Sequence, residues 1–269
     1  MTKKPHPFIP QILAPALTLF GVVACATTAS TYNNLGNVKS VLGKDEEALS
    51  DYTKAIELNP KNAAAYKNRG DAKFVLGKPE EAIAADYTKA IELNPKDAAA
   101  YKNRGDAKFV LGKPEEAIAA DYTKAIELNP QDAEGYLSPG LLNFILDKKA
   151  EALADFNHVI DLHPKDASAY NSRGDAKFAL GKTEEAIADY NKAIELNPKD
   201  ADAYNDRGYA KSDLGKKAEA IADYNKAIDL NPNDEFFYFV RANAKSDLGK
   251  KEDAISDYSK AIDQQGKLI

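Results

Sequence analysis

The chain has few residues of the types that carry out acid–base, nucleophilic or metal chemistry. Its histidines are His6 near the N-terminus and His158 and His163 much further along, with no cysteine beside the last two. Glutamate pairs such as Glu184 and Glu185 recur at predicted helix starts, where a carboxylate stabilises the positive end of the helix dipole. No glycine-rich phosphate-binding loop is present. We therefore predict no catalytic centre, no metal site and no cofactor, and hence a protein that is not an enzyme.

Cys25, the only cysteine in the chain, points to a different kind of chemistry. Residues 1–24 read as a bacterial export signal, because Lys3 and Lys4 supply positive charge and the apolar run that follows is too short for a membrane-spanning helix. The Val-Val-Ala sequence before the cysteine resembles the lipobox of bacterial lipoproteins. This resemblance implies cleavage before Cys25 and attachment of diacylglycerol to its thiol.

Two other fates of the leader stay open. Cleavage after Ala26, in an A-x-A pattern, would discard Cys25 and release a soluble protein, and an uncleaved leader would act as an anchor. An aspartate directly after the cysteine would favour retention in the inner membrane. The residue there is Ala26, which favours the outer membrane. We expect an exported protein of the cell envelope, an outer-membrane lipoprotein facing the periplasm or the surface.

The spacing of the prolines indicates that the chain is built of repeats. Each repeat can be numbered so that its last proline is position 32. Twelve of the 15 glycines then fall at position 8 or 15, and thirteen of the 14 tyrosines fall at position 4 or 24. A period near 34 residues is typical of helical repeat arrays. The six prolines stand 34 or 35 residues apart, at Pro60, Pro95, Pro130, Pro164, Pro198 and Pro232.

Each repeat is predicted to form two helices. In repeat 167–200, Asp166 can cap the first helix, and Gly181 is the expected left-handed stop. Thr183 is then predicted to cap the second helix. This helix ends before Pro198, because proline cannot continue a helix and disfavours helical geometry in the residue before it.

Small and aromatic residues mark the contact between the two helices. Gly174, Ala186 and Ala193 let the backbones approach closely, while Tyr170 and Tyr190 fill the gaps. Aromatic residues at positions 4 and 24, glycine at 8, alanine at 20 and 27 and proline at 32 together resemble the tetratricopeptide repeat (TPR). Position 11, often aromatic in that family, is mostly lysine here. Position 7, usually leucine, is arginine in five repeats: Arg69, Arg104, Arg173, Arg207 and Arg241.

The resemblance implies an all-α fold, a right-handed superhelical solenoid of about seven TPR helix-turn-helix repeats in which each unit packs only against its neighbours. The expected organisation is a lipoprotein-type signal peptide at 1–24, a short tether at 25–28, and repeats at 29–62, 63–97, 98–132, 133–166 (divergent), 167–200, 201–234 and 235–269, the last including the C-terminus.

Three irregularities interrupt the pattern. Repeats two and three each hold one extra alanine, at 84–85 and 119–120. We expect a bulge or a longer turn to absorb it, because one added residue rotates the rest of a helix by about 100°. In repeat four, Pro139 predicts a helix that starts late with Ser138 as its cap, and the alternative is a merely degenerate repeat. Repeat seven has no extra polar helix to close the array, so we expect its last face to be exposed.

The TPR resemblance also implies a binding site. In the family, first helices line a concave surface at positions 2, 5, 6, 9, 12 and 13, and this surface binds peptides or partner helices. An apolar strip along it suits an amphipathic helix or an extended apolar peptide. Alternatively, each phenylalanine at position 12 covers the tyrosine–glycine contact of its own repeat. The predicted groove residues are Phe74, Phe109, Leu137, Leu141, Phe144, Ile145, Phe178, Lys67, Asn68, Lys102 and Asn103.

The lysines and asparagines of that groove supply part of the carboxylate clamp found in chaperone-binding TPR domains. However, Asp71 and Asp106 stand where the clamp needs asparagine, and their charge would repel a bound carboxylate. This makes a carboxylate clamp the weaker interpretation.

A second apolar patch is predicted at the start of repeat seven, formed by Phe236, Phe239 and Val240, while Phe237 and Tyr238 are assigned to the core. It would serve self-association or partner docking, and local packing is the alternative.

Net charge restricts the partners. The charge of −6 becomes −8 when Lys3 and Lys4 are removed with the leader, and no lysine-rich stripe suits nucleic acid. We expect protein or peptide partners, no nucleic acid, membrane contact through the lipid anchor only, and self-association through the C-terminal end as an option. The predicted function is a non-enzymatic, lipid-anchored interaction scaffold. The alternative is a soluble secreted or periplasmic TPR module of chaperone-like or regulatory type.

Overall fold

The computed structural model describes residues 28–265 apart from residues 79 and 81. Within this part of the chain all regular structure is helical, with no strand, which confirms the all-α prediction. Cys25 and the leader lie outside the described residues. The chain divides into two compact units, Met1–Asn129 and Pro130–Ile269, and each is described by itself.

In the first unit, helix-turn-helix pairs follow one another. Each helix packs against the one before it and the one after it, as α3 does with α2 and η1. The elements are a helix over 28–41, α2 (Asp45–Leu58), α3 (Ala63–Val75), the π-helix η1 (Ala82–Tyr87), α5 (Thr88–Leu93), α6 (Ala98–Val110), α7 (Pro114–Glu116), the π-helix η2 (Ala117–Tyr122) and α8 (Thr123–Leu128).

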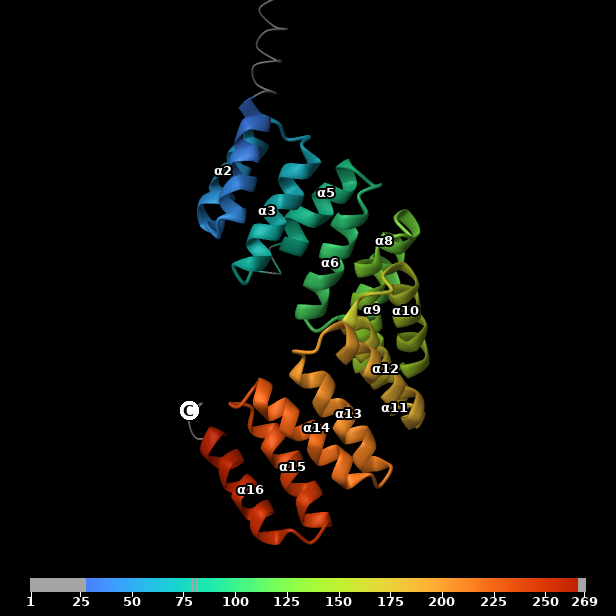
Figure 1. Ribbon diagram of the computed structural model, residues 1–269. Helices are drawn as coiled ribbons and strands as arrows, with labels where there is room; N and C mark the ends of the chain where they lie inside the picture. The colour runs from blue at the N-terminus through green and yellow to red at the C-terminus, as the bar shows by residue number, and fades with distance from the viewer. Residues whose placement is uncertain (1–27, 79, 81, 266–269) are drawn as a thin grey trace, which may run out of the picture. The chain divides into compact units, whose positions relative to one another are not determined.

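The second unit continues the pattern without π-helices among its described residues. Consecutive helices pack side by side, as Figure 1 shows for α13 to α16. The elements are α9 (Ala133–Ile145), α10 (Lys149–Leu162), α11 (Ala167–Ala179), α12 (Thr183–Leu196), α13 (Ala201–Asp213), α14 (Lys217–Leu230), α15 (Glu235–Asp247) and α16 (Lys251–Gln265).

The first helices begin as the sequence predicted. The Asp166 carboxylate accepts hydrogen bonds from the backbone N–H groups of Ser168 and Ala169, and Asn62 accepts one from Ala65. These side chains satisfy amides that have no partner inside the first turn. Asp97, Asp132, Asp200 and Asp234 cap their helices in the same way.

The second helices begin differently from the prediction. Thr183 is not the cap of α12, because Lys182 occupies the N-cap and its carbonyl already accepts the first helical hydrogen bond from Ala186. The tight turn at Gly181, where φ is +74°, brings the helix start one residue earlier than expected. Thr183 is instead buried, and its hydroxyl donates to Asp213 over 3.4 Å.

A close approach of backbone to aromatic ring explains the glycine at position 8. A Cβ atom added at Gly174 would lie 2.5 Å from the ring of Tyr190, which is buried. In repeat four the same contact joins Gly140 to Phe156. The prediction that small residues let the paired helices approach closely is therefore confirmed.

The extra alanines of repeats two and three are absorbed as expected. Each falls inside a π-helix, η1 or η2, whose wider turn accommodates one more residue before a regular helix resumes at Thr88 or Thr123. Tyr87 and Tyr122, which follow the insertion, therefore keep their buried positions.

The late start predicted for repeat four is wrong. Helix α9 begins at Ala133, is capped by Asp132 and runs through Pro139, so Ser138 is not a cap. Proline removes one hydrogen bond to the carbonyl four residues earlier. The helix persists because its packed face buries Pro139, Gly140 and Leu142, and this tertiary packing outweighs the lost bond.

The arginine at position 7 connects three helices through a buried carboxylate. Arg173 of α11 donates from Nε and Nη2 to both oxygens of Asp189 in α12, over 2.9 and 2.6 Å, and from Nη1 to Asn157 of α10 over 2.9 Å. Lys177, at position 11, also reaches Asp189, with 2.8 Å between Nζ and Oδ2. The guanidinium lies over the ring of Tyr170, 5.3 Å from its centroid.

This set, which we call the arginine bridge, explains both departures from the family pattern. Arginine at position 7 and lysine at position 11 act together, since both compensate the aspartate at position 23. A buried carboxylate is costly to leave uncompensated, which makes the two substitutions interdependent. The bridge occurs as Arg69–Asp86, Arg104–Asp121, Arg173–Asp189, Arg207–Asp223 and Arg241–Asp257.

We expect Arg173→Leu, which restores the usual family residue, to lower the free energy of local unfolding of α11 and α12 by about 3 kcal/mol. Lys177 alone would then face Asp189. Native-state hydrogen exchange measures this locally, which suits an array that need not unfold in one step.

Lys192→Ala is the control, because the Lys192–Glu195 pair is exposed and such pairs contribute about 0–1 kcal/mol. Equal protection in the two variants would contradict a stabilising role for the arginine bridge.

Candidate functional site

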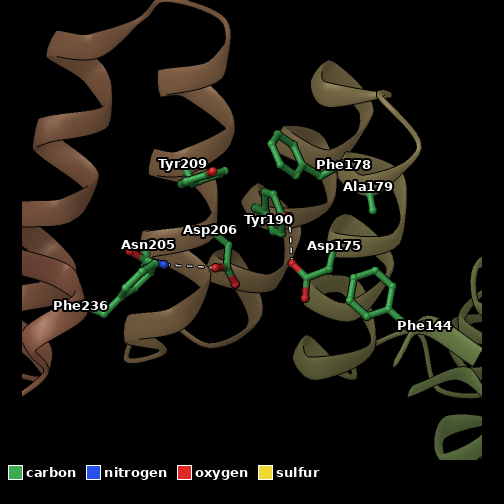
Figure 2. A pocket seen from close by; sticks show the side chains of 9 residues that line it. All are labelled: Phe144, Asp175, Phe178, Ala179, Tyr190, Asn205, Asp206, Tyr209 and Phe236. Atoms are coloured by element: carbon green, nitrogen blue, oxygen red, sulfur yellow. Dashed lines mark hydrogen bonds between the residues drawn. The ribbon is translucent and has the colours of Figure 1, made fainter. Parts of the chain in front are cut away.

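A cavity of about 270 Å³ opens among the first helices of the second unit. Figure 2 shows its lining, in which three phenylalanines that the sequence singled out come together. Five more of its residues come from the same set of first helices, and Tyr190 comes from a second helix. The lining residues are Phe144 of α9, Asp175, Phe178 and Ala179 of α11, Tyr190 of α12, Asn205, Asp206 and Tyr209 of α13, and Phe236 of α15.

The aromatic walls are anchored in the core. Phe144 packs against Phe156, and Phe178 packs against Tyr190, so each phenylalanine covers the aromatic side of its own repeat. Phe178 also meets Tyr209 edge to face, with 5.6 Å between ring centroids and an interplanar angle of 78°. Phe144 and Phe178 therefore pack on the core and also line the cavity.

Two carboxylates form the polar part of the lining. Asp175 accepts a hydrogen bond from the Tyr190 hydroxyl over 2.9 Å. Asp206 accepts from the side-chain amides of Asn171 and Asn205, over 2.9 and 3.2 Å. Among the described residues, no lysine or arginine lies within salt-bridge distance of either carboxylate.

Burial makes these carboxylates weaker acids. It raises the pKa of Asp175 to about 7, with a further rise from the nearby charge of Asp206 and an opposing effect of the Tyr190 hydrogen bond. Burial also raises the pKa of Asp206, although its two asparagine donors counteract the shift. The cavity therefore holds two carboxyl groups that burial makes harder to ionise.

In the first unit, the aspartates at position 9, the position of Asp175, have basic neighbours. Asp71 pairs with Lys67 over 2.9 Å and also accepts from Asn103 over 2.7 Å. The Oδ2 atom of Asp106 lies 3.8 Å from the Nζ atom of Lys102. Position 5 supplies lysine in repeats two and three but asparagine, Asn171 and Asn205, in repeats five and six.

Comparison with known proteins now identifies the repeat. Three tetratricopeptide repeat models match the chain, one at residues 29–62 and 201–234, one at 51–84 and one at 237–267. A fourth model, described as TPR repeat, matches residues 70–112 and 174–215. These ranges cover more than half of the chain. The chain belongs to the tetratricopeptide repeat family. TPR proteins are generally non-enzymatic scaffolds with protein or peptide partners.

Several solved TPR structures are similar to the chain. A tetratricopeptide repeat protein from Parabacteroides merdae ATCC 43184 is 25% identical with a TM-score of 0.69, and the match covers 88% of this chain and 93% of that one. YrrB, described as a TPR protein with an unusual peptide-binding site, is 27% identical with a TM-score of 0.58 over 67% of this chain and 92% of its own. MamA is 28% identical with a TM-score of 0.56 over 61% and 95%. No curated protein sequence matches the chain.

The described residues offer no group of three or more histidine, cysteine or acidic side chains able to hold a metal ion. None of the described TPR helices is long and apolar enough to cross a membrane.

The remaining apolar groove residues differ in exposure. Leu141 and Ile145 are exposed, by 42% and 65%, on the helix that carries Phe144. Leu137 is partly buried against the core of repeats four and five. In the first unit, Phe74 packs on Tyr87 and Phe109 is exposed. A continuous apolar strip through all these residues stays a prediction.

The polar groove residues are engaged by other side chains of the first unit. Lys67 and Lys102 are engaged by carboxylates of their own helices. Asn68 donates to Asn33 and Asn37, over 3.2 and 2.8 Å. This internal pairing gives no support to a carboxylate clamp.

The second patch is smaller than predicted. Val240 is 5% exposed and packs in the core against Tyr224 of α14, because α15 turns a broad face toward the preceding helix. Phe236 and Phe239 are about half exposed and stack with 6.5 Å between ring centroids. Phe237 is buried, as expected.

Sequence reasoning missed Asn205, Asp206 and Tyr209 as part of this lining. The available signal was the change at position 5 from lysine in repeats two and three to Asn171 and Asn205, which leaves acidic groove residues without a neighbouring ammonium group.

We expect Asp175 to titrate near pH 7, whereas an unperturbed aspartate titrates near pH 4. Because the folded state then holds a proton that the unfolded state releases, this group's contribution to stability falls as pH rises from about 4 to about 7, by at most roughly 1.4 kcal/mol per pH unit. Asp175→Asn should remove that part of the slope.

Side-chain carboxyl NMR gives the titration midpoint, and denaturation at several pH values gives the slope. A midpoint near 4, or a slope that Asp175→Asn leaves unchanged, would contradict this prediction.

Proposed function

We propose that this protein is a non-enzymatic interaction scaffold that binds a segment of a partner protein in the groove of its second unit. The observation that carries the proposal is the cavity that Phe144, Phe178 and Phe236 line from concave-surface positions of repeats four, five and seven. Membership of the TPR family supports it, since the partners of that family are proteins or peptides.

The surroundings of the cavity favour an extended or helical segment as the ligand. Leu141 and Ile145 are exposed beside Phe144, and Phe239 is exposed beside Phe236. Exposed apolar groups on both sides of a hollow offer contacts to several consecutive residues of a partner. YrrB, a structure to which the chain is similar, is described as having a peptide-binding site of its own.

We further propose that the scaffold is anchored in the bacterial cell envelope by a lipid on Cys25. The support lies in the sequence: a short apolar leader with Lys3 and Lys4, followed by Val-Val-Ala directly before the only cysteine. A soluble exported TPR module remains the competing proposal.

Self-association is a second candidate use of the C-terminal end. Ile255 and Ile262 of α16 are exposed by 64% and 69%, on the last described helix of the array. Terminal repeats with apolar outer faces are prone to association, because such faces normally need a polar cap.

Substitution in the groove should reduce partner capture. We expect Leu141→Ala and Phe144→Ala each to weaken it by about 1–2 kcal/mol, or roughly 5- to 30-fold, because apolar anchors dominate such interfaces. Crosslinking and pull-down from intact envelopes measures capture, and circular dichroism checks helix content.

Val38→Ala is the matched control, since Val38 is exposed and apolar but stands at position 10 of its repeat, outside the groove positions. Unchanged capture by both groove variants at unchanged helix content would remove the groove proposal.

The lipid anchor predicts that the protein incorporates a palmitate analogue during growth and that Cys25→Ala abolishes this labelling. The reason is chemical, because acylation of the new N-terminus follows transfer of diacylglycerol to the thiol. Gel fluorescence after labelling makes the measurement. A parent protein that never labels is not a lipoprotein, and the lipid-anchor proposal would then fail.

A further inference from the structure

The cavity of the second unit contains negative charge that the protein itself leaves uncompensated. Asp206 lies close enough to Asp175 for its charge to oppose ionisation of Asp175, and among the described residues neither carboxylate has a basic partner. In the first unit, the aspartates at position 9 have Lys67 and Lys102 one helical turn earlier. Repeats five and six keep acidic groups in the groove but hold no lysine at position 5.

Hydrogen-bond acceptors in the same place are also without donors. Asn205 is 6% exposed and donates from its amide nitrogen to Asp206, but its Oδ1 atom has no partner. The Oδ1 atom of the neighbouring Asn171 also has none. A buried acceptor left without a donor is destabilising, so these atoms favour a ligand that donates hydrogen bonds.

Aromatic rings complete the lining. Figure 2 shows Asp175 and Asp206 in the middle of the view, between Phe144 and Phe236, with Phe178 and Tyr209 beside them. Ring faces attract cations, and this attraction is strongest where water is excluded. Carboxylates, an unpaired amide oxygen and aromatic rings in one cavity are together complementary to a positive charge.

We propose that this cavity takes the side chain of a lysine or arginine in the partner segment, an inference that rests on the proposed function and specifies its ligand. The cavity volume of about 270 Å³ suits one long side chain. The aliphatic stem would lie along Phe178 and Tyr209, and the charged head would reach the two carboxylates. Exposed Phe236 and Leu141 would contact apolar residues on either side of the cation.

Binding of a cation is coupled to a proton. The charged and titratable groups that face Asp175 are Tyr190 from α12 and Asp206 and Asp202 from α13. None of the three carries a positive charge that could stabilise the ionised form of Asp175. A bound cation would supply that charge, favour ionisation of Asp175 and displace its proton. Affinity for a basic ligand therefore rises with pH through the range near 7.

Fluorescence anisotropy with the full chain tests the proposal. The probes are capped, fluorescent peptides with a central lysine, arginine, norleucine or glutamate flanked by leucine and alanine. Norleucine retains the aliphatic stem but lacks the charge. We expect the lysine or arginine peptide to bind at least about 10-fold more tightly than the norleucine peptide at about pH 8, and this preference to shrink at about pH 6.

Variants locate the effect in the cavity. Asp175→Asn and Asp206→Asn should each reduce the preference for the basic peptide several-fold. Asn171→Lys should abolish it, because the new ammonium group would lie one turn before Asp175, as Lys67 does before Asp71. Asp229→Asn removes an exposed charge from α14 and should leave the preference unchanged.

The outcomes separate this inference from the proposal on which it rests. Equal binding of the lysine and norleucine peptides, with both weakened by Leu141→Ala, would overturn the cation site and leave the apolar groove standing. A preference that survives Asn171→Lys would also overturn it, as would a failure of every probe to bind. Crosslinked partner capture that is lost with Leu141→Ala would still support the scaffold function.

Discussion

A buried carboxylate in the second helix of most repeats is the constraint on which the rest of the structure depends. Asp189 and Asp223 are almost fully buried, and an isolated charge there would be prohibitively costly. Arg173 and Arg207 compensate them from the first helix and also bind an asparagine of the preceding repeat. One residue type thus fixes the pairing within a repeat and its contact with the repeat before, which a repeat array needs because its units have only neighbours to pack against.

The same principle of charge compensation makes the groove chemically uneven. Repeats two and three neutralise Asp71 and Asp106 with lysines of their own helices. Repeats five and six leave Asp175 and Asp206 without such lysines, and burial raises the pKa of both. The loss of lysine at position 5 and, in repeat six, the aspartate at position 6 separate the two situations, so function can vary along the array while the scaffold is kept.

Repeat four shows what happens when the arginine bridge is absent. Pro139 stands at position 7, and Asp155 receives a hydrogen bond from Asn143 over 2.9 Å where other repeats use arginine and lysine. Burial consequently raises the pKa of Asp155. Apolar packing through Leu142 and Phe156 holds the helix in place. The same helix also carries the apolar Leu141, which is exposed beside the cavity.

The sequence by itself determined the features that depend on neighbours along the chain. Asp166 caps a helix, Gly181 ends one with a positive φ, and the extra alanines produce π-helices, because each effect acts within one turn of its own residue. Only the tertiary structure decided which side chains lie in the same environment. It buried Val240, carried the helix through Pro139 and brought Asp206, from the repeat after Asp175, into the same cavity. Periodicity says which face of a helix a residue occupies, but burial, and with it the charge of a carboxylate, depends on the helices packed around it.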